Sequence, residues 1–164
     1  EKKRLERDFL HKTDGTERSA TLREEMQDAM EQGAGIYRSG EKLTRAADRL
    51  RELKERFRNV AVQDSSRTFN TELTTVLELS SMLDVAEAMI HSALWREESR
   101  GAHQRTDFTD RDDEGFLAHS LTYRNSDGSS RVESLPVTIT QCSARWLCFC
   151  KLILAPGLRL RCFT

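Results

Sequence analysis

Residues 70–94 hold the longest apolar series of the chain and read N-T-E-L-T-T-V-L-E-L-S-S-M-L-D-V-A-E-A-M-I-H-S-A-L. Apolar side chains return there at steps of three and four residues, and they occupy more than one side of the expected helix. Asn70 is a favourable N-cap, and Gly101 is a candidate C′ residue at the other end. The series therefore predicts a central helix over residues 70–100 that is contacted from two sides.

Two shorter apolar series precede the central helix. The first predicts a helix over residues 20–38, in which Gly33 would let another backbone approach closely. The second predicts a helix over residues 41–59, with Ser39 as a candidate cap. Three helices joined by short connections predict an antiparallel three-helix bundle over residues 19–106.

The segments that flank the bundle differ in character. Residues 1–18 form a polar lead-in with only three large apolar side chains, enough for one amphipathic turn. Residues 107–140 begin with an acidic turn, and then two segments with alternating character around a turn-rich centre predict a β-hairpin. Residues 141–164 form an atypical cationic tail with all four cysteines, which we expect to contribute little to the fold. The predicted fold class is mainly α, an antiparallel three-helix bundle followed by a small β-hairpin extension.

Composition and charge exclude several classes of function. The net charge is −1 with 32% charged residues, which gives no global field to attract nucleic acid or a membrane. The four cysteines lack the paired spacing of a zinc site and lie outside the bundle, so we expect no disulfide framework and a reducing compartment. The sequence contains no G-x-G-x-x-G or G-x-x-x-x-G-K loop to hold phosphates. We therefore expect no metal-binding residue and no phosphate-binding loop in this chain, which does not look catalytically self-sufficient.

Charged and polar side chains concentrate just after the central helix. Arg96, Arg100 and His103 would share one face if the helix continued, and Ser99 and Arg105 lie beside them in the sequence. Guanidinium groups suit carboxylates, so one hypothesis is a site for a dicarboxylate. The favoured hypothesis is that these five residues dock the bundle onto a neighbouring domain, because no general base and no cofactor cradle accompany them.

The acidic run D-R-D-D-E at residues 110–114 begins like a calcium-binding loop. The twelfth position of such a loop would be Leu121, where a bidentate Glu is needed, so calcium is excluded. We expect these acids to cap a short turn or to pair with the arginines.

Four motifs carry a resemblance to a known family. They are L-R-E-E-M-Q-D-A-M-E-Q-G-A-G-I-Y-R at residues 22–38, D-S-S-R-T-F-N-T-E-L at 64–73, R-E-E-S-R-G-A-H-Q-R-T-D at 96–107 and H-S-L-T-Y-R at 119–124. Together they resemble the C-terminal region of the flavoprotein subunit of fumarate reductase and succinate dehydrogenase. L-aspartate oxidase shares the E-S-R-G element, but the A-H-Q-R and G-I-Y-R elements look more like fumarate reductase.

The resemblance implies an intact subunit in which FAD-binding and capping domains accompany the bundle. In this family the flavin passes a hydride to fumarate, and an arginine outside the matching region supplies the proton. Electrons arrive through an iron–sulfur subunit and membrane anchor subunits that meet quinol. The resemblance thus implies a cytoplasmic protein that is peripheral on the inner face of the cell membrane. The family's catalytic and flavin-linking residues lie outside the matching region, so the resemblance implies no catalytic and no cofactor-binding residue in this chain. We expect the chain by itself to bind no FAD, to be inactive and to bind no nucleic acid.

Other interpretations of the sequence stay open. The C-terminal domain of succinate dehydrogenase or of L-aspartate oxidase would carry much of the same pattern. A free-standing, non-catalytic helical interaction module would also fit, and a protein that uses its cationic tail at a membrane surface is a third hypothesis. The chain begins with Glu1 and without a secretory leader pattern, so we expect a piece of a longer polypeptide.

Overall fold

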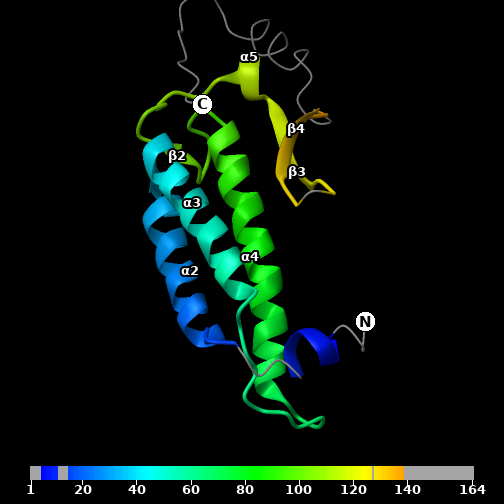
Figure 1. Ribbon diagram of the computed structural model, residues 1–164. Helices are drawn as coiled ribbons and strands as arrows, with labels where there is room; N and C mark the ends of the chain where they lie inside the picture. Colours follow the sequence, from blue (N-terminus) through cyan, green and yellow to red (C-terminus); the bar gives the residue numbers. More distant parts are fainter. Residues whose placement is uncertain (1–4, 11–14, 127, 139–164) are drawn as a thin grey trace, which may run out of the picture.

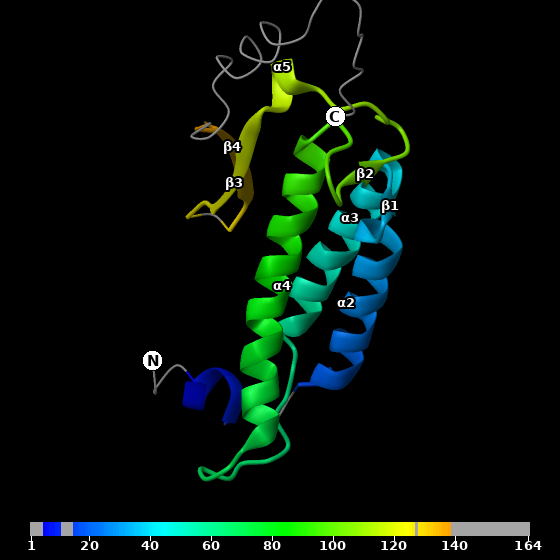
Figure 2. The same ribbon diagram turned by 180° about the vertical axis from the view of Figure 1, so that it is seen from behind.

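Three long helices form the body of the protein (Figure 1). The computed structural model describes residues 5–10, 15–126 and 128–138. Helices α2 (Ser19–Ala34), α3 (Gly40–Phe57) and α4 (Thr71–Trp95) run up, down and up, side by side, in both opposite views (Figure 2). The predicted fold class, an antiparallel three-helix bundle with a small β-hairpin, is confirmed. No helix in the described residues is both long and apolar enough to cross a bilayer.

Six smaller elements complete the fold. They are η1 (Glu6–Leu10), β1 (Tyr37–Arg38), β2 (Gln104–Arg105), α5 (Asp113–Phe116), β3 (Ala118–Arg124) and β4 (Ser130–Pro136). The strands form two separate pairs, with β1 and β2 parallel and β3 and β4 antiparallel. The predicted tail at residues 141–164 lies outside the described residues.

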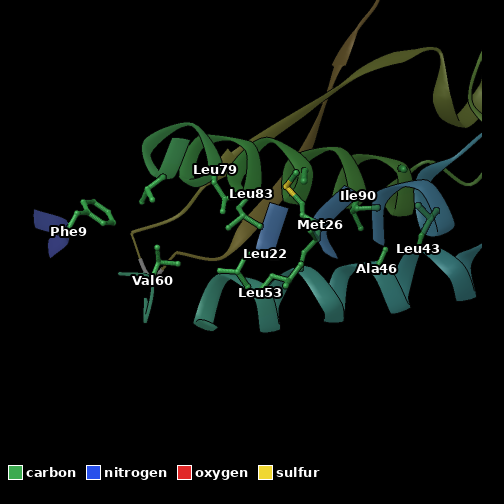
Figure 3. Close-up of a cluster of buried hydrophobic side chains, with 14 of the residues drawn as sticks. Phe9, Leu22, Met26, Leu43, Ala46, Leu53, Val60, Leu79, Leu83 and Ile90 are labelled. Atoms are coloured by element: carbon green, nitrogen blue, oxygen red, sulfur yellow. The ribbon is translucent and has the colours of Figure 1, made fainter. Parts of the chain in front are cut away.

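The core is a continuous column of apolar side chains between the three helices (Figure 3). It is made from one apolar stripe on each helix, as the three- and four-residue spacing predicts. The members drawn and labelled in Figure 3 are Phe9, Leu22, Met26, Leu43, Ala46, Leu53, Val60, Leu79, Leu83 and Ile90. The column reaches η1, where the Phe9 ring lies 6.2 Å from the Phe57 ring. The polar lead-in therefore contributes Phe9 to the core, and its other two large apolar side chains, Leu5 and Leu10, pack against it.

Helices α2 and α3 approach each other closely at Gly33. A Cβ atom at this position would lie 2.3 Å from the Ala46 Cβ and 3.1 Å from the Lys42 carbonyl oxygen. Neither atom belongs to a flexible side-chain end, so a larger residue would force the two helices apart. The predicted close packing at Gly33 is confirmed.

Helix α4 is contacted from two sides, as predicted. The bundle covers one side, and the β3–β4 hairpin lies along another (Figure 1). The Ser92 and Thr122 hydroxyl groups lie 2.6 Å apart, and the Arg124 guanidinium donates to Asp84 at 2.6 Å. A two-stranded hairpin is marginally stable by itself, so these contacts with α4 stabilise it.

The predicted starts of α3 and α4 are correct. The Ser39 side chain accepts a hydrogen bond from the Lys42 amide, and Asn70 accepts from the Leu73 amide at 2.7 Å. Two predicted helix ends are wrong. The first helix stops at Ala34 and not at residue 38, because Tyr37–Arg38 pairs with β2.

The other wrong end is that of α4, which stops at Trp95 and not at residue 100. Arg96 has extended backbone, with φ −87° and ψ 102°, so Arg100 and Gly101 lie in a loop. Gly101 is therefore not the C′ residue of α4, although its φ of +56° is the left-handed conformation that favours glycine.

Candidate functional site

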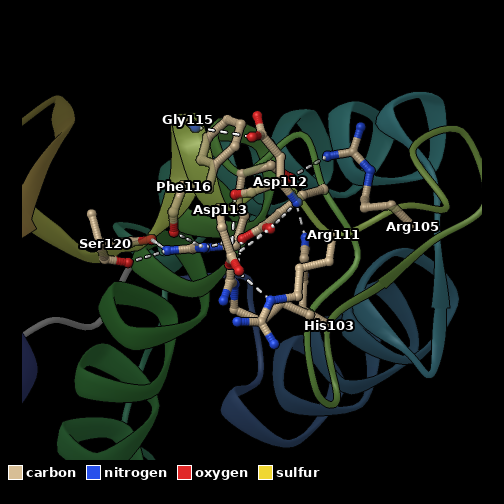
Figure 4. Close-up of polar contacts among 12 residues, drawn as sticks. His103, Arg105, Arg111, Asp112, Asp113, Gly115, Phe116 and Ser120 are labelled. Carbon is tan, nitrogen blue, oxygen red and sulfur yellow. Dashed lines mark hydrogen bonds and ion pairs between the residues drawn. The ribbon is translucent and has the colours of Figure 1, made fainter. Parts of the chain in front are cut away.

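The segment after α4 folds back over the end of that helix and then leads through α5 into the hairpin (Figure 1). Its path is fixed by side-chain hydrogen bonds, many of which are drawn in Figure 4. All five residues that the sequence singles out, Arg96, Ser99, Arg100, His103 and Arg105, lie in this segment. The structure therefore brings the predicted residues together without a continuous helix.

Glu98 is the centre of this segment and is fully buried. One carboxylate oxygen accepts hydrogen bonds from Arg96 and from the Arg100 Nε, the latter at 2.7 Å. The other accepts from the Arg100 Nη2 at 3.0 Å and from the Asp112 amide at 2.8 Å. Burial acts to raise the pKa of Glu98, but the bonds from Arg100, the Asp112 amide and Arg96 outweigh it and lower the pKa. The residue is thus a buried carboxylate with both oxygens paired.

The two arginines on Glu98 carry this pairing into neighbouring elements. Arg96 donates to the carbonyl oxygens of Phe116 at 2.9 Å and Ala118 at 2.5 Å, and so joins α4 to α5 and β3. Arg100 donates to the Asp113 carboxylate at 2.7 Å. Figure 4 shows Asp112, Asp113, Phe116 and Ser120 converging on this network. The network therefore holds the hairpin extension to the bundle.

Arg105 is nearly fully buried and closes the C-terminal end of α4. Its guanidinium donates to the carbonyl oxygens of Ala93 at 3.0 Å and Arg96 at 3.1 Å, where a cation also suits the helix dipole. Its other donors form a bidentate pair with Asp107, at 2.7 and 2.8 Å. Asp107 accepts a further bond from the Gly40 amide at 2.7 Å. The Arg105–Asp107 pair therefore joins the end of α4 to the start of α3.

The pKa of Asp107 is lowered well below its usual range. The hydrogen bonds from Arg105 are the main cause, and the Gly40 amide adds to them. Burial of the carboxylate acts in the opposite direction and is outweighed. Asp107 therefore stays ionised wherever the protein is folded near neutral pH.

His103 is held between arginines. Its Nδ1 atom lies 2.9 Å from the Arg38 guanidinium, which can only donate, so Nδ1 accepts. Its Nε2 atom then carries the proton and donates to the Arg96 carbonyl oxygen at 3.2 Å. The pKa of His103 is lowered, chiefly by burial and also by the positive charge of Arg38, Arg105 and Arg96. The imidazole is therefore neutral, and its two hydrogen bonds fix the path of the segment.

Ser99 makes contacts that hold the backbone of the segment. Its hydroxyl donates to the Phe108 carbonyl oxygen at 2.7 Å and accepts from the Arg105 amide at 2.9 Å. The guanidinium groups of Arg96, Arg100 and Arg105 likewise bond to acids and carbonyl oxygens of this same region. This arrangement favours a structural use of the five residues over a dicarboxylate site. Their role in docking a neighbouring domain stays a prediction.

The acids at residues 110–114 do what the sequence indicates. Asp112 caps α5, because its carboxylate accepts from the amides of Glu114 at 3.0 Å and Gly115 at 2.9 Å. Asp113 pairs with Arg100 at 2.7 Å and with Arg111 at 2.8 Å. Both alternatives, a capped turn and pairs with arginines, are confirmed.

Sequence reasoning misses the residues that organise the site. From the sequence alone, Glu98 and Asp107 are identified only as part of the motif at residues 96–107, and Arg38 only as the last residue of the first predicted helix. The signal for Glu98 is its place between two arginines at two-residue spacing, which a bend in the chain can turn onto one carboxylate. No local signal identifies Arg38, because its partner His103 lies 65 positions away.

Comparisons with known proteins agree on one family. A family model described as fumarate reductase flavoprotein C-term matches residues 23–148. The fumarate reductase flavoprotein subunit of Mycobacterium tuberculosis H37Rv is 59% identical over 138 residues, which are 84% of this chain and 24% of that protein. The succinate dehydrogenase flavoprotein subunit of Coxiella burnetii is 40% identical over 114 residues, which are 70% of this chain and 19% of that protein.

A solved structure gives the same result. A chain of E. coli quinol fumarate reductase superposes with a TM-score of 0.82 at 48% identity, covering 87% of this chain and 24% of that one. The 164 residues therefore span about a quarter of the length of these fumarate reductase relatives.

Proposed function

The chain belongs to the family of fumarate reductase flavoprotein C-terminal domains, and from this membership we propose that it supports the reduction of fumarate to succinate in an FAD-containing subunit. The observation that carries the proposal is the 59% identity to a fumarate reductase subunit, against 40% to a succinate dehydrogenase subunit. Succinate oxidation by the same site is the second candidate, since the two activities are one reaction in opposite directions.

The role of this chain in that reaction is structural support. FAD supplies the hydride chemistry when it is bound, and the FAD-binding and capping domains of the intact subunit would hold it. The arginine donors at residues 96, 100 and 105 are used on Glu98, Asp107, Asp113 and backbone carbonyl oxygens, so they do not fit the pyrophosphate of a flavin without breaking those bonds. The five predicted residues would act by giving the segment at residues 96–116 the shape that docks onto those domains.

Partners and location follow from the same proposal. The solved E. coli relative is a quinol fumarate reductase, so an iron–sulfur subunit and membrane anchor subunits would deliver electrons from quinol to this protein as well. The subunit would then be cytoplasmic and peripheral on the inner face of the cell membrane, through those partners.

The proposal is tested by producing the intact subunit from the full reading frame that encodes this chain. We expect the purified subunit to show flavin absorbance and to reduce fumarate with a reduced dye as electron donor. The chain of 164 residues should show neither. A full-length subunit that binds flavin but turns over neither fumarate nor succinate would refute the proposed function. The ratio of the two rates identifies the favoured direction.

Arg100 tests the structural role in the same subunit. Arg100→Ala removes the bonds to Glu98 and Asp113, so we expect lower flavin content per subunit. Arg51→Ala is the matched control, because Arg51 is exposed on α3 and pairs with Asp48 three positions earlier on the same helix. Unchanged flavin content and activity in Arg100→Ala would refute docking through this segment.

A further inference from the structure

Phe69 is unusual in two respects. Its side chain is 94% exposed, the highest value among the exposed large hydrophobic residues of the described chain. Its φ is +54°, and no other non-glycine residue in the described part of the chain has a positive φ. For an L-residue other than glycine this left-handed conformation costs about 1–2 kcal/mol. The fold thus holds an aromatic side chain in water at a conformational cost.

The loop around Phe69 is fixed by hydrogen bonds on both sides. The amides of Gln63 and Asp64 each donate to Glu72 at 2.8 Å. The Asn70 side chain donates to the carbonyl oxygens of Asp64 at 2.5 Å and Ser66 at 3.1 Å. These bonds hold the backbone before Phe69 to the first turn of α4. The ring is therefore presented by an ordered loop, which lowers the conformational entropy lost when it binds a partner.

The chemistry around the ring indicates the kind of surface it meets. The residues just before it in the sequence, Ser65, Ser66 and Thr68, are exposed, polar and uncharged, and Arg67 lies 3.5 Å from the Glu6 carboxylate. Aromatic side chains are enriched at protein–protein contacts, where an apolar anchor fills a pocket and polar residues form the rim.

The position of the loop indicates which protein surface it meets. The loop lies at the same end of the bundle as η1, in both opposite views (Figures 1 and 2), and Arg67 contacts η1 through Glu6. The chain matches a C-terminal family model and only 24% of its fumarate reductase relative. The greater part of the intact subunit would therefore join the bundle through η1, next to Phe69.

We propose that Phe69 is an apolar anchor that inserts into a hydrophobic pocket on the preceding domains of the flavoprotein polypeptide, an inference that rests on the proposed function. It gives the bundle a second docking point, at the opposite end from the segment at residues 96–116. The rigid loop and the exposed ring together set the position of the bundle on those domains.

The experiment compares three variants in two backgrounds. Phe69→Ser removes the apolar ring, Phe69→Leu keeps an apolar side chain at the same backbone conformation, and Thr68→Ala is the matched control in the same loop. In the 164-residue chain all three should keep the wild-type unfolding midpoint, because both side chains are exposed. This background shows that the variants fold.

In the full-length subunit the variants should separate. Phe69→Ser should raise the rate of limited proteolysis between the bundle and the preceding domains by about tenfold, as loss of an apolar anchor predicts. Phe69→Leu should lie near wild type, and Thr68→Ala should equal it. Equal proteolysis of Phe69→Ser and wild type would overturn the proposal. So would a defect seen only when the iron–sulfur subunit is added, since the pocket would then belong to that partner.

The anchor and the proposed function are tested by different measurements, so the failure of one can be told from the failure of the other. Flavin content and fumarate turnover of the wild-type subunit test the function, whereas the proteolysis rates of the variants test the anchor. A wild-type subunit that reduces fumarate while Phe69→Ser behaves like wild type refutes only the anchor.

Discussion

The two ends of the bundle are closed by loops that use opposite physical means. At the end of α4, fully buried Glu98 binds two arginines and a backbone amide, and nearly buried Arg105 binds Asp107 and two carbonyl oxygens. At the start of α4, the carboxylates of Asp64 and Glu72 receive backbone amides at the surface. Water can replace a lost bond at the surface but not in the interior. The comparison therefore predicts that single substitutions lower the free energy of unfolding much more at the end of α4 than at its start.

The largest effect is expected at Glu98. Glu98→Ala leaves Arg96 and Arg100 without their buried counterion, and removal of one partner from a buried ion pair costs about 3–5 kcal/mol. Urea unfolding of the chain measures the change in the free energy of unfolding. Glu97→Ala is the control, since Glu97 is exposed and should cost almost nothing. Similar losses of stability for the two variants would contradict the assigned role of Glu98 as a buried counterion.

Substitution of Asp107 should cause the next largest decrease in the free energy of unfolding. Asp107→Ala removes the bidentate partner of Arg105 and the acceptor for the Gly40 amide, but Arg105 keeps its bonds to Ala93 and Arg96. We expect a loss of about 1–3 kcal/mol, the range for an unpaired buried group. The comparison variant is Asp110→Ala, since Asp110 is an exposed acid of the same segment that lies outside the Arg105–Asp107 pair. If Asp107→Ala unfolds at the wild-type urea concentration, the Arg105–Asp107 pair does not join α3 to α4.

At the other end of the bundle, Asn70 is the side chain whose loss is expected to lower the free energy of unfolding most. Asn70→Ala removes the acceptor for the Leu73 amide and the two bonds that frame the loop, and loss of an N-cap costs about 1 kcal/mol. Asn70→Asp keeps the cap acceptor but loses the two donated bonds, so it should retain part of the stability. Urea unfolding of both variants separates the cap from the loop contacts. If Asn70→Ala lowers the free energy of unfolding as much as Glu98→Ala does, the predicted difference between the two ends of α4 is wrong.

The ends also differ in how far the sequence predicts them. Asn70 alone predicts the start of α4, because an N-cap bond spans three residues and depends on local sequence. The sequence pattern places the end of α4 five residues too late. Residues 96–100 could continue a helix, but Glu98 bonds instead to the Asp112 amide, 14 positions away. Local propensity does not contain such a contact.

The same distinction explains the candidate site. Residue types alone identify Arg96, Ser99, Arg100, His103 and Arg105, and the structure does bring these five together. Their partners are predictable only where they are close in sequence, as with the acids at residues 110–114. The β1–β2 pair and the Arg38–His103 contact join residues more than 60 positions apart, and no two-residue strand has a periodicity to read. The positive φ of Phe69 likewise has no sequence signal, since glycine is the residue expected there.

The smallest effect, and the one that tests the electrostatics of the buried end, is the pH dependence from His103. Its pKa is lowered in the folded state, so the unfolded chain takes up a proton at higher pH than the folded chain does. Stability therefore rises with pH through the ordinary histidine value of about 6.5 and is lost as the pH falls below it. Carboxylates with lowered pKa, such as Asp107, lose their stabilisation only at more acid pH.

The measurement is the free energy of unfolding at about pH 7.5 and about pH 5.5, on either side of that value, for wild type and two variants. His103→Gln should remove part of the decrease seen in wild type, because glutamine cannot be protonated beside Arg38. His119→Gln is the control, since His119 is exposed on β3 and should leave the decrease unchanged. If His103→Gln shows the full wild-type decrease, the imidazole is not held neutral between Arg38 and the Arg96 carbonyl. The decrease in stability at lower pH would then come from titratable groups other than His103.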